Sequence, residues 1–193
     1  DANGCTARDT GTVTEPTQLL ATHTFTDVNC FGGTDGTAQV VATGGTLAYS
    51  FSWGHGPTAE NLNDLAAGAY TYTVTDGKGC TATGNFVVDQ PAAPLDLTSV
   101  VQDVTCFGFS NGAIDVTPTG GTAPYAFAWS NSLLQLLAAT TEDIANLPAA
   151  TYLLVATDSR NCIDSLYSIV NQPDKLILAD SVVDVSCNGG TDG

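Results

Sequence analysis

Six cysteines carry the most distinctive chemistry in this chain of 193 residues. No two of them form a Cys-x-x-Cys pair and no Cys-His cluster exists, so the sequence does not predict a zinc site. A nucleophilic cysteine needs a nearby histidine as its base, and the chain has only His23 and His55. Disulfide bonds are therefore the expected chemistry, which favours an oxidising, extracellular compartment. The six candidates are Cys5, Cys30, Cys80, Cys106, Cys162 and Cys187.

Carboxylates are the second source of chemistry, because 20 acidic residues face only 4 basic ones and the net charge is −16. That charge argues against nucleic acid and anionic membrane as partners, since both need basic patches. No apolar run is long enough to insert into a membrane. Most acids stand in turns, where an Asp caps its own backbone. Calcium is the metal that such ligands suit, with Asp35, Asp76 and Asp89 as candidates, but no EF-hand or nonapeptide spacing appears and no cofactor is expected.

The sequence repeats itself, and every cysteine lies in one of the repeated segments. The segment 28–32, Val-Asn-Cys-Phe-Gly, recurs with changes at 104–108 and 185–189. The segment 76–80, Asp-Gly-Lys-Gly-Cys, recurs at 158–162, and residues 1–5 are a third copy. Trp53 and Trp129 are 76 residues apart, whereas the segments that begin at 76 and 158 are 82 apart. The second copy therefore carries six extra residues within 130–146, and insertions of that size lie in loops.

The repeat boundaries predict four segments. Residues 1–16 are the tail of a preceding repeat, 17–91 and 92–173 are two whole repeats, and 174–193 are the head of a following one. Gln90-Pro91 and Gln172-Pro173 close the whole repeats. Neither end shows an altered, capping sequence, so we expect this chain to be a window on a longer array.

Each repeat is predicted to be a small β-sandwich. Polar and apolar residues alternate with period two in segments such as 71–75, and Gly-rich turns follow at the spacing of short antiparallel strands. About seven strands fit into 76 to 82 residues. Trp53 and Trp129 fall on the third predicted strand, and Tyr70 and Tyr152 fall at the start of the sixth, as the buried Trp and the tyrosine corner do in immunoglobulin-like folds. The expected fold is all-β, with tandem immunoglobulin-like sandwiches stacked head to tail.

This topology bears on the disulfides. In such a sandwich the first and last strands run parallel, so a cysteine ending the first strand and one starting the last lie at opposite poles, ~20 Å apart. A disulfide needs Cα atoms within about 7 Å. Pairing within a repeat, Cys30 with Cys80 or Cys106 with Cys162, is therefore strained, although it stays open. Head-to-tail stacking would instead let Cys30 reach Cys162, which is the pairing we favour.

Catalysis is not expected, because an active site on one repeat should not need residues that the other repeat lacks, and no triad recurs. Phe31 and Phe107 follow the first-strand cysteines and either bind sugars or fill the joint between domains; we favour the joint.

The repeated pattern resembles the SprB repeat family. The resemblance rests on Val-x-Cys-Phe-Gly, on Gly-Gly-Thr with Tyr-x-Phe-x-Trp, on Thr-Asp-x-x-x-Cys and on the closing Gln-Pro, all in order and over nearly the whole chain. Asn188 replaces the usual Phe, and Ala150 stands where Gly68 stands in repeat 1. The resemblance implies a large cell-surface adhesin of Bacteroidota, exported by the type IX secretion system and of the gliding-motility type. Asp-Ser-aliphatic triplets at Ser165 and Ser181 match the O-glycosylation pattern of that phylum.

The sequence thus favours a structural and adhesive segment of a long extracellular filament or stalk. Its partners would be neighbouring repeats, other copies in a fibre, and surface glycans or a substratum as the adhesion target. The alternative is an array of carbohydrate-binding modules attached to a secreted enzyme. That alternative predicts an exposed aromatic platform at equivalent positions of both repeats.

Overall fold

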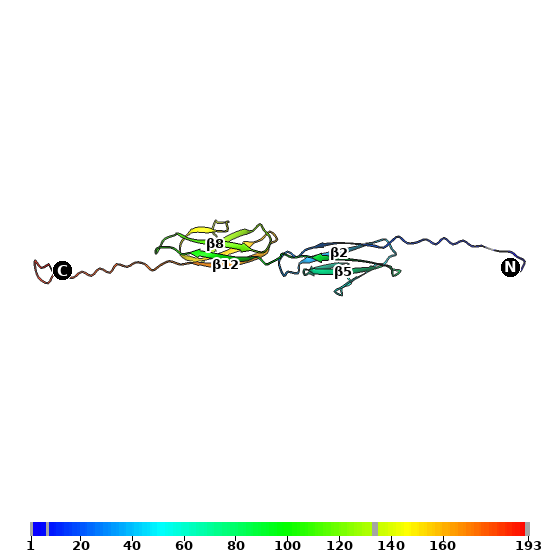
Figure 1. Cartoon of the computed structure of the whole chain (residues 1–193), viewed down its shortest axis with the longest axis horizontal. Helices are drawn as coiled ribbons and strands as arrows, with labels where there is room; N and C mark the ends of the chain where they lie inside the picture. The colour runs from blue at the N-terminus through cyan, green and yellow to red at the C-terminus, as the bar shows by residue number, and fades with distance from the viewer. Residues whose placement is uncertain (1, 7, 133–134, 192–193) are drawn as a thin grey trace. The chain divides into compact units, whose positions relative to one another are not determined.

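The computed structural model describes residues 2–6, 8–132 and 135–191. It divides into two compact units, Asp1–Pro94 and Leu95–Gly193, and all of the regular structure described is β (Figure 1). No helix among the described residues has the length and apolar character needed to cross a membrane.

The first unit holds six strands, which pair antiparallel in two sheets of order β1-β2-β4 and β3-β5-β6. Inward and outward residues alternate along each strand, as the burial of β2 and β5 shows. The strands are β1 (Leu20–Thr26), β2 (Gly36–Thr43), β3 (Ser50–Trp53), β4 (Asn61–Leu65), β5 (Gly68–Thr75) and β6 (Thr81–Val88).

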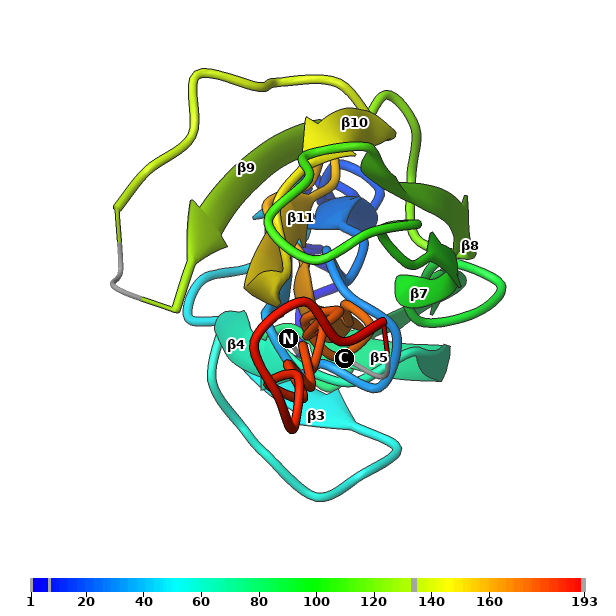
Figure 2. The ribbon, with the colours of Figure 1, turned by 90° about the vertical axis from the view of Figure 1, so that its left-hand side faces the viewer.

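The second unit repeats this arrangement with sheets of order β7-β8-β10 and β9-β11-β12. Figure 2 shows β7 beside β8 in this unit. The extra residues predicted within 130–146 lie between β9 and β10, and their positions 133 and 134 are outside the described residues. The strands are β7 (Asp96–Gln102), β8 (Gly112–Thr119), β9 (Ala126–Asn131), β10 (Ile144–Leu147), β11 (Ala150–Thr157) and β12 (Ile163–Val170).

The strand order of each unit is that of an immunoglobulin-like sandwich, in which the first, second and fifth strands form one sheet and the third, sixth and seventh form the other. Each unit has six strands in its described part rather than the seven predicted, because no separate strand forms before β4 or before β10. The tyrosine corners therefore stand on the fifth strand of each unit, not the sixth.

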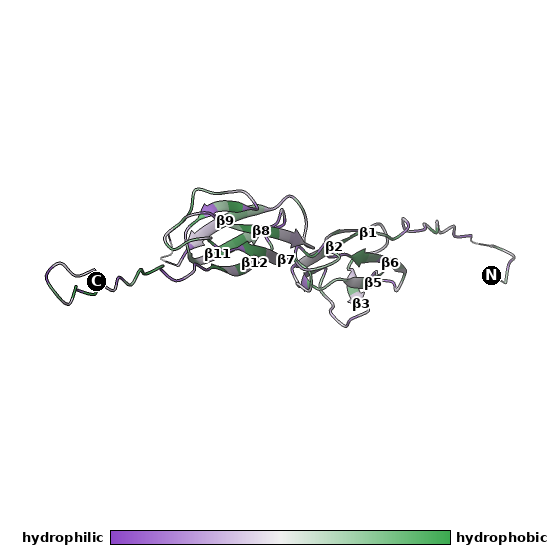
Figure 3. Ribbon diagram, turned by 60° about the vertical axis from the view of Figure 1, so that its left-hand side comes forward, coloured by the Kyte–Doolittle hydropathy of each residue, from purple (hydrophilic) through white to green (hydrophobic). Residues whose placement is uncertain are grey.

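The two tryptophans and the two corner tyrosines lie in the cores, as predicted. Trp53 and Trp129 are 3% and 0% exposed, and each indole N–H donates to a backbone carbonyl, of Ala59 and Thr141. Hydrophobic stretches lie along the strands (Figure 3), and the buried hydrophobic residues form one core cluster in each unit.

The corner hydrogen bonds are alike in the two units. The Tyr70 hydroxyl donates to the Ala66 carbonyl and the Tyr152 hydroxyl to the Pro148 carbonyl, both over 2.9 Å. Ala150 in place of Gly68 therefore does not prevent the corner from forming.

The segments outside the sandwiches keep the turns of the repeat without its strands. The Gly190 N–H donates to the Cys187 carbonyl over 2.9 Å, as the Gly33 N–H does to the Cys30 carbonyl. No strand is assigned in the described residues before β1 or after β12. A short turn can fold on local chemistry alone, whereas a strand needs partners.

Candidate functional site: the two poles of each repeat

Each sandwich has an entry pole, where the chain enters its first strand, and an exit pole, where it leaves the last. Gln18 and Leu19, which precede β1, line one pocket together with Cys80 and Thr81 at the start of β6. Beyond the other ends of these strands, the Val28 N–H donates to the Asp89 carbonyl over 2.9 Å. β1 and β6 therefore run parallel, as predicted, and their cysteines lie at opposite poles.

An aspartate anchors the entry pole of repeat 1. One carboxylate oxygen of Asp76 accepts the N–H of Thr46 over 2.8 Å, and the other accepts the N–H groups of Lys78 and Cys80 over 2.9 and 2.8 Å. Asp76 is only 6% exposed. The carboxylate thus ties the turn before β6 to the loop between β2 and β3.

Asp158 forms the same anchor in repeat 2. It accepts the N–H of Thr122 on one oxygen and the N–H groups of Arg160 and Cys162 on the other, all over 2.8 Å. Sequence reasoning expected Asp76 and Asp158 to cap their own turns. It missed the bond to a second loop, which depends on tertiary packing.

These hydrogen bonds set the ionisation of both carboxyls. The N–H of Thr46, assisted by the N–H groups of Cys80 and Lys78, holds the pKa of Asp76 below its usual range. Burial alone would raise the pKa of Asp158. The pKa is nevertheless lowered, because the carboxylate accepts the N–H groups of Cys162, Thr122 and Arg160 and lies near the Arg160 charge.

The Gly-Gly pair of the repeat pattern makes room for this anchor. Gly45 has a φ of 60°, and a Cβ there would lie 2.8 Å from an Asp76 carboxylate oxygen. Gly121 has a φ of 58°, and its Cβ would lie 2.9 Å from Asp158. A side chain at either place would be strained and would displace the carboxylate.

A set of hydrogen bonds, which we term the exit clamp, joins the ends of the first and last strands. In repeat 1 the Asp89 N–H donates to the Asp27 carboxylate over 2.9 Å, beside the bond from Val28 to Asp89. The side chain of Gln90 accepts the Gly32 N–H over 2.7 Å. The clamp therefore fixes the Cys30 turn against the end of β6.

Repeat 2 has the same exit clamp. The Val104 N–H donates to the Asn171 carbonyl over 3.0 Å, and the Asn171 N–H donates to the Asp103 carboxylate over 2.7 Å. Gln172 accepts the Gly108 N–H over 2.9 Å. The recurrence of Gln-Pro after both last strands was the sequence signal for this contact.

The cysteines at the poles differ in state. Cys30 and Cys162 are each disulfide-bonded, whereas Cys80, Cys106 and Cys187 are free thiols. Because Cys80 and Cys106 are free, neither repeat has the internal disulfide that the sequence left open. The pairing of Cys30 with Cys162 stays a prediction.

The calcium candidates are not brought together. Asp76 anchors the entry pole, whereas Asp35 and Asp89 lie at the exit pole, an eight-residue strand or ~23 Å away. Asp35 instead accepts the backbone and side-chain N–H groups of Asn29 over 3.0 and 2.5 Å, and the backbone bond lowers its pKa. No group of three metal-ligating side chains occurs within the described residues.

The remaining candidates lie on the surface. Phe31 and Phe107 are 47% and 49% exposed at the exit poles. Ser165 is exposed on β12, and Ser181 is exposed in the segment that follows it. His23, which sequence reasoning left without a role, packs against Phe86 and bonds the Tyr72 hydroxyl through Nδ1 over 3.0 Å.

Three solved structures that are similar to the chain share little sequence identity with it. The extracellular domains 3–5 of Drosophila OTK are 13% identical with a TM-score of 0.44, over 80% of this chain and 62% of that one. The amphioxus IgVJ-C2 molecule is 12% identical with a TM-score of 0.35, over 82% and 99%. Murine CEACAM1b is 13% identical with a TM-score of 0.33, over 79% and 100%. The chain thus spans less than two thirds of the OTK structure.

No curated protein matches the chain. The SprB repeat family model matches residues 22–58 and 98–134. Each match runs from the first strand of a sandwich to just beyond the third. The first residues of the two matches are 76 positions apart, as Trp53 and Trp129 are. Two segments of the chain therefore match the SprB repeat, each within its own immunoglobulin-like sandwich.

Proposed function

We propose that this chain is a load-bearing segment of a long extracellular repeat protein, a cell-surface filament or stalk of the adhesin type. The observation that carries the proposal is the pair of poles. In both repeats the most characteristic residues of the pattern serve to fix the entry turn and the exit clamp. These residues join the ends of strands and loops that are distant in the sequence.

The geometry of the poles suits tension along the chain. Because the first and last strands run parallel, a force on the two ends of a repeat slides these strands past each other. In the reduced chain, the bonds from Val28 to Asp89 and from Val104 to Asn171 then share the load with the Asp and Gln contacts beside them. Repeat 2 adds the Asp164 carboxylate, which accepts the Leu97 N–H over 2.9 Å.

An extracellular site is supported by the disulfide-bonded state of Cys30 and Cys162, since such bonds persist in oxidising compartments. A net charge of −16 keeps neighbouring fibres soluble and apart. Adhesion, type IX export and gliding motility are the finer parts of the proposal, and they rest on the SprB repeats.

Single-molecule pulling on the reduced chain tests the load-bearing role. We expect two discrete unfolding steps, each releasing roughly 230–270 Å of extended chain at about 3.3–3.6 Å per residue, for the 69 residues from Leu20 to Val88 and the 75 residues from Asp96 to Val170. The longer step belongs to repeat 2. A featureless extension without steps would contradict the proposal.

Asp103→Ala provides the matched test of the clamp. It removes the acceptor for the Asn171 N–H, so the unfolding force of repeat 2 should fall. Repeat 1 in the same molecule, with Asp27 intact, is the internal control. An unchanged unfolding force for repeat 2 would show that the clamp does not carry the load.

A carbohydrate-binding array remains the second candidate, because Phe31 and Phe107 are both about half exposed at equivalent positions. It predicts glycan-array binding by this chain that Phe107→Ala weakens. The stalk proposal predicts no glycan binding that depends on Phe107.

A further inference from the structure

The outer side of the sheet β9-β11-β12 in repeat 2 is apolar, although it faces solvent. Ile163, Tyr167 and Ile169 of the edge strand β12 are 67%, 69% and 58% exposed. On the central strand β11, Leu153 pairs with Tyr167, and Val155 follows two residues later on the same side of the sheet. The solvent side of an antiparallel sheet normally carries polar residues. We call the surface of these five side chains the apolar face.

The residues inserted in repeat 2 enlarge the apolar face. Leu136, in the segment between β9 and β10, forms an antiparallel bridge with Ser130 of β9. Ser130 is in turn the partner of Leu153. Because directly paired residues lie on the same side of a sheet, Leu136 continues the row that Tyr167 and Leu153 begin. The side chain of Leu136 is 82% exposed.

In repeat 1 the same side of the sheet β3-β5-β6 carries mostly hydroxyl and amide groups. The five residues of the apolar face correspond, in chain order, to Thr71, Thr73, Thr81, Asn85 and Val87. The sandwich therefore forms with a polar side at these positions, so its fold does not require the apolar face. An exposed apolar surface that the fold does not require marks a site of interaction.

The apolar face carries no charge, in a chain whose net charge is −16. Asp164 is the only charged residue of β9, β11 and β12, and the structure describes all three strands. Its carboxylate accepts the Leu97 N–H over 2.9 Å and is thus directed to the other sheet. That other sheet exposes Asp96 and Asp115. Two copies that meet through their apolar faces therefore keep these exposed carboxylates apart.

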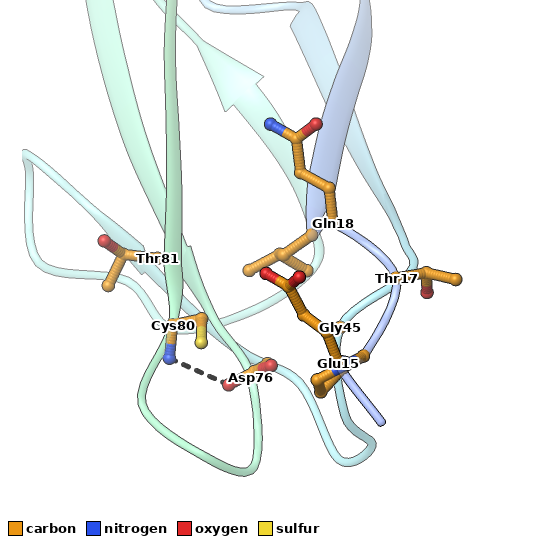
Figure 4. A pocket seen from close by; sticks show the side chains of 9 residues that line it. Glu15, Thr17, Gln18, Gly45, Asp76, Cys80 and Thr81 are labelled. Atoms are coloured by element: carbon orange, nitrogen blue, oxygen red, sulfur yellow. Dashed lines mark hydrogen bonds between the residues drawn. The ribbon is translucent and has the colours of Figure 1, made fainter. Parts of the chain in front are cut away.

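The pocket at the entry pole of repeat 1 does not have this property. The carboxylates of Glu15 and Asp76 are among the groups that line it (Figure 4). A second acidic copy would be repelled there, whereas the apolar face offers no charge to repel it.

The area of the apolar face fits the requirement of a dimer. Its four most exposed side chains, three on β12 and Leu136, expose roughly 400 Å² of apolar surface, at about 150 Å² for each fully exposed side chain. The half-buried Leu153 and Val155 add to this area. A stable interface buries about 800 Å² of each partner, of which roughly 56–65% is apolar. The apolar face therefore supplies most of the apolar surface of such an interface.

From these observations we propose that the apolar face of repeat 2 binds the apolar face of a second copy of this chain. The contact is isologous, with two sheets packed face to face about 10 Å apart. The proposal rests on the filament function and deepens it, because it joins two filaments side by side through repeats of this kind. Repeats with a hydroxyl-rich side, such as repeat 1, stay in contact with water.

Sedimentation equilibrium of the full chain in reductant, which prevents disulfides between copies, tests this proposal. We expect a reversible dimer with a Kd of micromolar order. The Kd should decrease as the salt concentration rises, because salt screens the repulsion between two acidic copies. A chain that stays monomeric at about 1 mM would overturn the proposal, since a Kd of micromolar order leaves little monomer there.

Tyr167→Asn and Leu153→Thr each introduce the residue that repeat 1 has at the same position, so the fold should tolerate both. Each should raise the Kd of the dimer by about tenfold or more. Val100→Ser is the matched control, because it removes a 73% exposed apolar side chain from the opposite sheet, and it should leave the Kd unchanged. A dimer that Val100→Ser weakens and Tyr167→Asn does not would overturn the proposal.

Ser165 provides a second test, because it lies between Ile163 and Tyr167 on the same side of β12. Mass spectrometry of the natural protein should find Ser165 unmodified. A glycan on Ser165 would cover the apolar face and would overturn the proposal. The unfolding steps of single molecules need no second copy, so a failure to dimerise is distinct from a failure of the load-bearing role.

Discussion

At the scale of residues, the two repeats fill one core position in different ways. Tyr72 of β5 faces Gly84 of β6 across the sheet, and Leu154 faces Leu166 at the equivalent pair in repeat 2. A Cβ on Gly84 would lie 2.7 Å from Cε1 of the Tyr72 ring. A large residue beside a glycine in one repeat thus corresponds to two medium-sized residues in the other.

Gly84→Ala should therefore destabilise repeat 1 by about 1–3 kcal/mol through overpacking. With Tyr72→Leu already present, the same change should cost much less, because the ring that it meets is gone. Urea unfolding of both single variants and the double variant measures the coupling. Additive effects would show that the ring and the glycine do not share this space.

Asp158→Asn is the residue-scale test of the entry turn. An amide nitrogen cannot accept the N–H bonds that one carboxylate oxygen receives, so we expect a loss of about 1–3 kcal/mol in the free energy of unfolding. Asp115→Asn, at an exposed residue of β8, is the control and should change little.

The lowered pKa of Asp158 predicts that the stability of repeat 2 depends on pH. Because the pKa of Asp158 is lower in the folded state than its ordinary value of about 3.9, the unfolded chain binds the proton first as the pH falls. Asp158 therefore contributes fully to the free energy of unfolding above its ordinary pKa of about 3.9. This contribution is lost as the pH falls through the lowered pKa of the folded state. Urea midpoints measured from about pH 6 to about pH 3 should drop in the wild type, and less steeply in Asp158→Asn.

At the scale of elements, each sandwich is closed by its corner tyrosine. Tyr70→Phe and Tyr152→Phe should each cost about 0.5–1.5 kcal/mol, since each removes one hydrogen bond and leaves the ring in place. Because the two bonds have the same length, the two costs should be similar. A thermal melt of each variant would reveal any difference, and a cost in only one repeat would mean that one corner is not structural.

The number of strands in each unit is the feature of the fold that the sequence predicted wrongly. Period-two alternation and turn spacing located the strands, but seven strands were expected and six formed in the described part of each unit. A short polar segment becomes a strand only if an edge accepts it, and that depends on the neighbouring sheet.

At the scale of the whole molecule, the disulfide state of Cys30 and Cys162 leads to a mapping prediction. Non-reducing peptide mapping of the oxidised chain should recover a Cys30–Cys162 peptide and no Cys30–Cys80 peptide. A Cys30–Cys80 peptide would contradict both this pairing and its mechanical consequence.

That consequence concerns the path of the load. If Cys30 is bonded to Cys162, a force on the two termini bypasses residues 31–161. The two long unfolding steps should then be absent in the oxidised chain and appear after reduction. Cys30→Ser should show both steps without reductant, and long steps in the oxidised wild type would show that the bond does not bypass the sandwiches.

The sequence by itself determined the repeat, its all-β character, the buried Trp53 and Trp129, and the corners at Tyr70 and Tyr152. These follow from local periodicity and from residue types that recur at fixed spacing. The tertiary structure decided which groups meet at the poles. Asp76 bonds Thr46, and Gln90 bonds Gly32, across separations that no local pattern encodes. Only the packing of one sheet on the other brings such distant backbone groups within hydrogen-bonding distance.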